Sequence, residues 1–245
     1  MTELLYGKNP ILEALRAGRR KFHRFFHLDS GKSDDSLAEA LALLEKKGVK
    51  VSSVSRDWFE AKIPGILTQG WAAEVGEYPY VDLEGLLAKS IEKQDSILLA
   101  LDQVQDPQNL GAILRSAECC GVDGVLVCTD RATHVTPAVC KASAGASEHL
   151  RVAKVVNLAR AIEVCQKAGF WSVGTDLSAT EDALSFQWPS RTLLILGSEG
   201  KGMRRLSREK CDFLIRLPLL GKISSLNVAA TAVVCLYENL RSRKK

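Results

Sequence analysis

Three short segments of this 245-residue chain combine residue types that bind ligands or transfer protons, and each follows an apolar run. The first contains Asn109 and Arg115, after the apolar run 96–104. An amide and a guanidinium supply hydrogen-bond donors that suit a phosphate or a polarised hydroxyl. The alternative is structural, because Asn is a good helix N-cap and a single arginine often marks the exposed face of a helix.

The second segment, Leu196–Met203, has the sequence LGSEGKGM. Its glycines, Gly197, Gly200 and Gly202, are spaced as G-x-x-G-x-G, whereas the dinucleotide fingerprint is G-x-G-x-x-G and the P-loop is G-x-x-x-x-G-K-[ST]. Glycine permits close approach of the backbone to a ligand. Glu199 repels phosphate, so the segment favours a ligand with donors or positive charge. Alternatively, it is a strand-to-helix turn whose Glu199 stabilises the next helix.

The third segment precedes a long apolar helix and carries Gly221, Lys222, Ser224, Ser225 and Asn227. A serine here, Ser224 or Ser225, is expected to cap the helix. Asn227 is then expected inside the first helical turn, where its side chain needs a hydrogen-bond partner. Two hydroxyls and an amide at a helix N-terminus form a polar site. Neither a G-x-S-x-G elbow nor a Ser-His-Asp order occurs, so hydrolase chemistry is not indicated.

The elements that position these segments are predicted from the pattern of apolar residues. Six apolar, branched runs are typical of strands buried on both faces: residues 96–104, 124–128, 149–155, 170–176, 192–197 and 212–218. Helices are predicted between them, at residues 109–120, about 136–144, 157–168, 203–210 and 225–240. This alternation predicts an α/β fold with a mostly parallel sheet and helices on both faces. Ligands of such sheets bind beyond the carboxyl ends of the strands, where the three polar segments begin.

The beginning of the chain predicts a smaller α/β unit over residues 1–77. Its opening helix is expected to have Asn9 as N-cap and to end at Gly18. Residues 78–94 contain a proline and a charged amphipathic helix, so we expect them to link this unit to a larger domain, residues 95–245.

Composition limits the classes of function. Hydrophobic residues make up 46% of the chain and charged residues 25%, as in ordinary soluble globular proteins. The net charge of +4 permits nucleic-acid binding without demanding it. No apolar run is long enough to cross a membrane and no secretory signal is evident, so a cytoplasmic location is expected. The seven cysteines form no C-x-x-C pair and lack metal-ligand spacing with the four histidines, so we expect reduced thiols and no metal.

Taken together, the three polar segments resemble the three motifs of the SpoU/TrmH family of RNA ribose 2′-O-methyltransferases. DPQNLGAILRSAECCG matches the N-x-G-x-x-x-R pattern of motif one with Asn109, Gly111 and Arg115. LLILGSEGKGM resembles motif two, and LPLLGKISSLNVAATAVVCLYE resembles motif three. The opening LYGKNPILEALRAG resembles the RNA-substrate-binding domain of the branch that modifies a guanosine of large-subunit (23S-type) ribosomal RNA.

The resemblance implies a C-terminal methyltransferase domain with a deep trefoil knot (the SPOUT fold), a homodimer, and S-adenosylmethionine as methyl donor. It implies that the donor is held at Gly197, Leu217 and Leu226, with Leu196 and Ser225 close by. The family assigns activation of the ribose 2′-OH to the motif-one arginine, here Arg115. The remaining functional residues, which would place the ribose and Arg115, are Asn109, Glu199, Ser225 and Asn227.

RNA recognition is expected in GRRKFHRFFH, where Arg19, Arg20, Lys21 and Arg24 alternate with aromatic residues. Basic side chains favour the RNA backbone, and exposed aromatic rings stack on unpaired bases. Alternatively, the phenylalanines belong to the core of a strand. One position departs from the family pattern, since Thr68-Gln69-Gly70 stands where the ribosomal branch has a segment resembling HQG.

Three other functions compete with this one. A transfer-RNA ribose methyltransferase would use the same chemistry on another RNA. A non-catalytic RNA-binding or ribosome-assembly protein would not need the full set of functional residues. An enzyme using a nicotinamide nucleotide is disfavoured, because G-x-G-x-x-G is absent.

Overall fold

The computed structural model describes residues 2–29 and 35–243, which form two compact units. The N-terminal unit comprises Met1–Pro79 together with Val135–His149, and the C-terminal unit comprises Tyr80–His134 and Leu150–Lys245. This division differs from the boundaries expected at residues 1–77, 78–94 and 95–245. A segment from inside the expected methyltransferase domain packs within the N-terminal unit, because long-range contacts override its position in the sequence.

The N-terminal unit contains a four-stranded sheet in the order β1-β4-β2-β3. β4 pairs antiparallel with both β1 and β2, and β2 pairs parallel with β3. The sequence pattern had not indicated β1. The elements of this unit are β1 (Thr2–Tyr6), α1 (Lys8–Ala17), β2 (Phe22–Leu28), α2 (Asp35–Lys46), β3 (Lys50–Val54), α3 (Arg56–Lys62), β4 (Trp71–Gly76), α6 (Pro137–Ala142) and the short 3-10 helix η1 (Ala146–Glu148).

The ends of α1 show one correct and one wrong expectation. Gly18 ends the helix in the left-handed conformation with φ 65°, as expected of a C-terminal glycine. Asn9 does not cap the helix. An Asn9 cap would place the first helical residue at position 10, but α1 begins at Lys8 and has Gly7, with φ 96°, in the cap position. A residue with a Cβ is strained at that φ, so Gly7 makes this turn possible.

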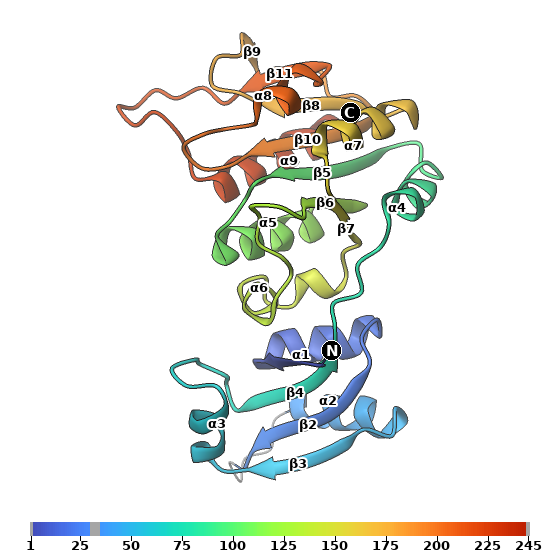
Figure 1. Cartoon of the computed structure of the whole chain (residues 1–245), viewed down its shortest axis with the longest axis vertical. Helices are drawn as coiled ribbons and strands as arrows, with labels where there is room; N and C mark the ends of the chain where they lie inside the picture. Colours follow the sequence, from blue (N-terminus) through green and yellow to red (C-terminus); the bar gives the residue numbers. More distant parts are fainter. Residues whose placement is uncertain (1, 30–34, 244–245) are drawn as a thin grey trace. The chain divides into compact units, whose positions relative to one another are not determined.

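The C-terminal unit contains a seven-stranded sheet in the order β7-β6-β5-β10-β8-β11-β9, and every neighbouring pair is parallel (Figure 1). The predicted α/β class and the six predicted strands are confirmed. The elements are α4 (Leu83–Ser90), β5 (Ser96–Asp102), α5 (Pro107–Cys119), β6 (Gly124–Cys128), β7 (Val152–Val155), α7 (Leu158–Lys167), β8 (Trp171–Thr175), β9 (Glu181–Asp182), β10 (Arg191–Gly197), α8 (Arg205–Glu209), β11 (Phe213–Arg216) and α9 (Val228–Arg243).

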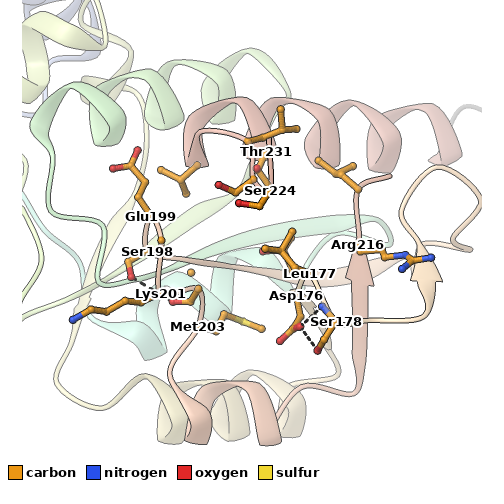
Figure 2. A pocket seen from close by; sticks show the side chains of 18 of the residues that line it. Asp176, Leu177, Ser178, Ser198, Glu199, Lys201, Met203, Arg216, Ser224 and Thr231 are labelled. Carbon is orange, nitrogen blue, oxygen red and sulfur yellow. Dashed lines mark hydrogen bonds between the residues drawn. The ribbon is translucent and has the colours of Figure 1, made fainter. Parts of the chain in front are cut away.

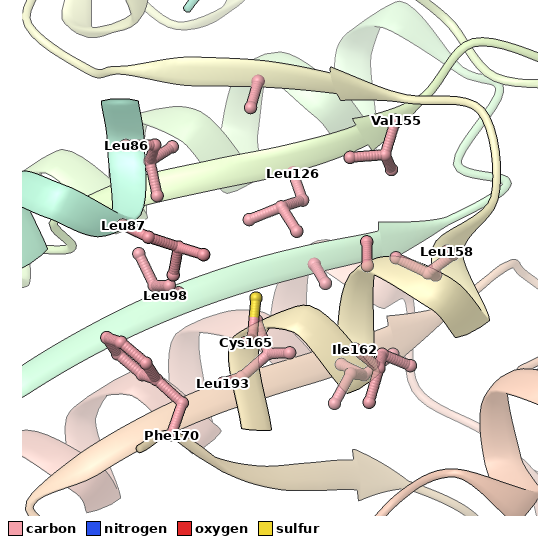
Figure 3. Packing of buried hydrophobic residues seen from close by; sticks show 14 of the residues in the cluster. Leu86, Leu87, Leu98, Leu126, Val155, Leu158, Ile162, Cys165, Phe170 and Leu193 are labelled. Atoms are coloured by element: carbon pink, nitrogen blue, oxygen red, sulfur yellow. The ribbon is translucent and has the colours of Figure 1, made fainter. Parts of the chain in front are cut away.

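The core of the C-terminal unit explains the apolar strands. On one face of the sheet, Leu87 of α4 and Ile162 of α7 belong to a cluster with Leu98, Leu126 and Leu193 of three strands (Figure 3). α5 and α9 contact each other, and α9 also packs against β10. Because helices supply apolar partners to both faces, the central strands need no polar face.

Within the described residues, no helix is long and apolar enough to cross a membrane. No group of three or more His, Cys, Asp or Glu side chains there is arranged to hold a metal ion. All seven cysteines are free, and five of them are buried, whereas Cys211 is partly buried and Cys119 is exposed. Most thiols therefore serve as small apolar core groups, as expected.

Candidate functional site

The carboxyl ends of β5, β10, β8 and β11 lie at one edge of the sheet, because these strands are parallel neighbours. Gly197, the last residue of β10, is paired with Asp102, the last residue of β5. The three polar segments follow β5, β10 and β11, so they all begin at this edge. This is the edge at which ligands of open α/β sheets bind.

Asn227 is the residue that caps α9. Its Oδ1 accepts hydrogen bonds from the backbone N–H groups of Ala229 at 2.8 Å and Ala230 at 3.3 Å. The expectation of a serine cap, with Asn227 inside the first turn, is therefore wrong by two to three residues, and α9 begins at Val228. Because backbone donors occupy Oδ1, the amide nitrogen of Asn227 must point away from the helix.

That nitrogen completes a side-chain network. Asn227 Nδ2 donates to Oδ1 of Asn109 at 3.0 Å and to Oε1 of Glu199 at 2.9 Å. Asn109 Nδ2 also donates to Oε1 of Glu199. Three of the residues expected to be functional therefore meet through direct hydrogen bonds. Two amide donors converge on one carboxylate oxygen, which fixes the direction of the Glu199 side chain.

Asn109 is free to take part because another residue caps its helix. Asp106 is the N-cap of α5, and its side chain accepts from the Gln108 backbone N–H at 2.9 Å. Asn109 lies in the first turn with its amide available for Glu199 and Asn227. The structural alternative for Asn109, a helix cap, is thus wrong.

Glu199 lies on a tight hairpin that follows β10. The backbone of Ser198 and Gly202 exchanges two hydrogen bonds, Ser198 N–H to Gly202 O at 3.1 Å and Gly202 N–H to Ser198 O at 2.9 Å. A Cβ on Gly197 would lie 2.1 Å from the carbonyl carbon of Gly202 and 2.2 Å from the nitrogen of Met203. Position 197 therefore requires glycine because the backbone of Gly202 and Met203 approaches it closely. From the sequence, a close approach to a ligand is expected instead.

A cavity of about 400 Å³ lies beside this hairpin (Figure 2). Lys201 borders it but is exposed and extends away from the other labelled side chains, as expected. The lining residues come from the loops after β8, β10 and β11 and from α9: Thr175, Asp176, Leu177, Ser178, Gly197, Ser198, Glu199, Gly200, Lys201, Gly202, Met203, Ile215, Arg216, Leu217, Leu219, Ser224, Ser225, Leu226, Val228, Thr231 and Cys235.

Four of the five residues expected to hold a cofactor line this cavity, namely Gly197, Leu217, Ser225 and Leu226. Leu196 does not line it, because its side chain is fully buried within β10. The lining therefore combines apolar side chains, hydroxyls and the backbone of a glycine-rich hairpin. Such a surface suits a small organic ligand held partly by main-chain groups.

The loop after β8 also lines the cavity, and the sequence interpretation had not included it. Asp176 accepts hydrogen bonds from the backbone N–H of Ser178 at 2.7 Å and from its hydroxyl at 2.6 Å, and pairs with Nε of Arg208 at 2.5 Å. Burial alone would raise the pKa of Asp176, but the Ser178 hydrogen bonds and the Arg208 charge outweigh it and lower that pKa. The polar residues at the end of strand 170–176 were the signal that could have identified this loop.

The cavity contains two carboxylate residues, Glu199 and Asp176, on its lining. Asp176 is neutralised by Arg208, whereas Glu199 receives only neutral amide donors. Oε2 of Glu199 has no donor among the described residues, so it is available to a ligand. At Glu199 this arrangement favours a group with positive charge or hydrogen-bond donors over a phosphate, while Lys201 and Arg216 place positive charge elsewhere on the lining.

Arg115 does not join the network. It lies on α5 six residues after Asn109, which corresponds to roughly 9 Å along the helix and about 120° around it. Its side chain is exposed and forms none of the hydrogen bonds or ion pairs found among residues 2–29 and 35–243. The guanidinium is thus free to bind an incoming phosphate or hydroxyl.

The four basic residues expected to bind RNA differ in exposure. Lys21 and Arg24 are exposed, and within residues 2–29 and 35–243 Arg24 makes only a 3.8 Å surface pair with Glu74. Arg19 is half-buried and donates to the backbone carbonyls of Glu148 and Pro79.

Arg20 is a correction to that expectation. Its side chain is fully buried, with Nε 3.0 Å from Oε2 of Glu148 and Nη1 2.7 Å from Oε2 of Glu3. The charge of Glu148 and Glu3 keeps the pKa of Arg20 above its ordinary value despite burial, which alone would lower it. Arg20 therefore stabilises the N-terminal unit and offers no charge to RNA.

The aromatic residues of this segment are also internal. Phe22, Phe25 and Phe26 are buried, and Phe26 stacks on Trp58 with ring centroids 4.4 Å apart. The core-strand alternative is confirmed for them. Thr68, at the position that departs from the family pattern, is buried, and its hydroxyl accepts from the Gly70 N–H at 3.3 Å within a turn.

Comparison with known proteins gives two family matches that together cover most of the chain. Residues 96–237 match the SpoU rRNA methylase family. Residues 4–81 match the family of RNA 2′-O ribose methyltransferase substrate-binding domains. The first match contains all three polar segments described above.

Similar proteins extend over the full length. A putative TrmH family tRNA/rRNA methyltransferase, YacO of Bacillus subtilis, is 39% identical, with 98% of this chain and 96% of that protein covered. The 23S rRNA (guanosine-2′-O-)-methyltransferase RlmB of Yersinia pestis is also 39% identical, with 99% and 98% covered. The crystal structure of the SpoU methyltransferase AviRb of Streptomyces viridochromogenes with AdoMet superposes with a TM-score of 0.82 at 27% identity, covering 99% of this chain and 90% of that one.

Proposed function

This chain belongs to the SpoU rRNA methylase family, and on that basis we propose that it transfers a methyl group from S-adenosylmethionine to a ribose 2′-OH of RNA. We propose a guanosine of 23S-type ribosomal RNA as the target, as in the name of the RlmB relative. The observation that carries the proposal is the hydrogen-bonded network of Asn109, Glu199 and Asn227, in which Glu199 also lines a cavity formed largely by the segments that resemble motifs two and three.

The residues of the cavity fit the proposed methyl donor. Gly197, Leu217 and Leu226 would hold it, with Ser225 beside them. The carboxylate of Glu199 tolerates the positive charge of a sulfonium and repels a phosphate. When bound, S-adenosylmethionine supplies an electrophilic methyl group. Leu196 does not line the cavity, so its buried side chain is given no contact in this proposal.

The remaining residues would act on the ribose. A 2′-OH is a weak nucleophile until its proton is withdrawn or strongly polarised. We assign this task to Arg115, whose free guanidinium binds the hydroxyl oxygen or the adjacent phosphate and makes the hydroxyl more acidic, so that its proton passes to the RNA phosphate or to solvent as the methyl group is accepted. Asn109, Asn227 and Glu199 would orient the ribose, with the unoccupied Oε2 of Glu199 as acceptor for a ribose hydroxyl or a donor cation.

The proposal also retains features implied by family membership: a homodimer, a trefoil knot in the C-terminal unit, and a cytoplasmic location. RNA contact by the N-terminal unit would use Lys21 and Arg24, which are exposed, with Arg19 in a secondary role. Arg20 is excluded from RNA contact because it is buried and forms ion pairs with Glu148 and Glu3.

The decisive experiment uses purified full-length chain, S-adenosylmethionine with a labelled methyl group, and RNA from cells that lack this gene. We expect label in 23S-type ribosomal RNA, at a single guanosine, with alkaline-resistant linkage at that nucleotide. Transfer to transfer RNA alone would reject the target and retain the chemistry. Specific RNA binding without any label transfer would reject the enzyme in favour of a ribosome-assembly protein.

A further inference from the structure

We propose that Asp102 and Arg204 are positioning residues of this site, which hold the hairpin Ser198–Gly202 so that Glu199 meets Asn109 and Asn227. The importance of that hairpin for catalysis rests on the proposed function. The contact between Asp102 and Arg204, called the anchor below, involves neither the Asn109–Glu199–Asn227 network nor the residues that line the cavity.

Asp102 has a fully buried carboxylate at the end of β5, and both of its oxygens are used by one residue. Oδ1 accepts from Nε of Arg204 at 2.6 Å, and Oδ2 accepts from the backbone N–H of Arg204 at 2.9 Å. A buried carboxylate is stable only with such compensation. Arg204 also donates from Nη2 to Sγ of Cys128, the last residue of β6, at 3.4 Å. The residue is thus tied to two neighbouring strand ends.

Asp102 controls both stems of the hairpin. The incoming stem ends at Gly197, which is paired with Asp102 in the sheet. The outgoing stem reaches Arg204 two residues after Gly202, and there the Asp102 carboxylate binds it again. One buried residue of a third segment therefore binds both stems, in addition to the backbone hydrogen bonds between Ser198 and Gly202 that join the stems directly.

This anchor adds to the hairpin's own two backbone hydrogen bonds between Ser198 and Gly202, because it ties the hairpin to the end of β5. Glu199, Gly200 and Lys201 are exposed, and Gly200 has a φ of 78°, which glycine adopts readily. The amide donors of Asn109 and Asn227 reach Glu199 only while the stems keep this loop in place. Preorganised groups contribute to catalysis only when they are held in place before the substrate arrives. Asp102 and Arg204 supply that restraint without touching the reacting atoms.

The test compares two adjacent arginines. Arg204→Gln removes the guanidinium and leaves the backbone N–H that binds Asp102. Arg205→Gln is the matched control, because Arg205 is 78% exposed at its side chain and pairs only with Glu209 in the described residues. Arg204→Lys restores one charged donor. All three are made in the full chain, and folding is checked by circular dichroism and thermal unfolding.

Two measurements decide the proposal. In Arg204→Gln, the amide hydrogens of Ser198 and Gly202 should exchange faster, and kcat should fall by roughly tenfold to a hundredfold with the KM for RNA unchanged. Arg204→Lys should lie between this variant and wild type, and Arg205→Gln should match wild type in both. Wild-type exchange rates in Arg204→Gln, or equal losses in Arg205→Gln, would overturn the anchor.

The same experiment separates this proposal from the proposed function. If the wild-type chain transfers no methyl group, the enzyme assignment fails while the exchange comparison still decides whether the anchor exists. If Arg204→Gln does not fold, Arg204→Lys carries the comparison. Faster exchange with unchanged kcat would show that the restraint has no catalytic role and would reject the positioning claim.

Discussion

Asn227 donates a hydrogen bond from its amide nitrogen to Oε1 of Glu199 at 2.9 Å, while its amide oxygen caps α9. The two roles use opposite ends of one side chain. Because the cap of α9 occupies the amide oxygen of Asn227, the amide nitrogen is the atom that faces Glu199. Substitutions at Asn227 can therefore remove the hydrogen bond to Glu199 while keeping the helix cap.

We expect Asn227→Asp to preserve the helix cap and abolish most of the activity. Aspartate caps helices as well as asparagine does, but it replaces the donor facing Glu199 with a second carboxylate. Asn227→Ala loses both roles, and the missing cap lowers the free energy of unfolding by about 1 kcal/mol. Thermal unfolding and label transfer to RNA, measured together, check both statements. A fully active Asn227→Asp protein would contradict the network.

Gly197→Ala should abolish binding of S-adenosylhomocysteine. The added Cβ would meet Gly202 and Met203 at a distance that no packed structure tolerates, so the hairpin must move into the cavity or away from it. Gly221→Ala is the control, since no heavy atom lies within 4 Å of that Cβ position. The measurement is the shift in unfolding temperature on adding the ligand. A full shift in Gly197→Ala would show that the hairpin does not shape the site.

Replacing Arg115 with alanine should lower kcat by about a hundredfold or more, the contribution typical of a group that assists proton removal. Affinity for S-adenosylhomocysteine should not change, because Arg115 does not line the cavity. Arg115→Lys should not restore the rate, since an ammonium lacks the planar fork of donors. Arg160→Ala, at an exposed position on α7, is the control. Native activity in Arg115→Ala would remove the assignment.

The buried pair of Arg20 and Glu148 predicts a large loss of stability without a direct effect on chemistry. Arg20→Met leaves Glu148 unpaired in the interior and should lower the free energy of unfolding by about 3–5 kcal/mol. Adding Glu148→Leu should recover much of that loss. The exposed pair of Arg24 and Glu74 is the comparison, and Arg24→Met should cost less than about 1 kcal/mol. Equal losses of unfolding free energy in Arg20→Met and Arg24→Met would contradict the difference between the buried and the exposed pair.

Asp176 predicts a pH dependence at the acid end. Its pKa in the folded protein lies below the ordinary value of 3.8, so its ion pair with Arg208 contributes fully at neutral pH. That contribution is lost only as the pH falls through the depressed pKa. The difference in unfolding temperature between wild type and Asp176→Asn should therefore stay constant from about pH 8 to about pH 5 and shrink below about pH 4. A difference that disappears near neutral pH would contradict the assigned shift.

Much of the fold was predictable because it depends on local pattern. Apolar runs such as 192–197 predicted buried strands, and the polar residues after them predicted the edge at which the site lies. The same reasoning missed β1, which has only five residues and gains its identity from pairing with β4. It also missed the loop after β8, because its polar residues are ordinary turn residues when seen alone.

Six strands of the seven-stranded sheet, its mostly parallel character, the three motif segments and the family resemblance could be read from the sequence, since each is encoded in neighbouring residues. Which side chains meet could be seen only once the chain was folded. Asn109 and Glu199 are 90 positions apart, and Arg20 and Glu148 are 128 apart. A basic residue beside aromatic ones looks the same in sequence whether it faces RNA or a buried carboxylate. The difference is set by long-range packing, which brings a distant acid to Arg20 and leaves Arg115 free.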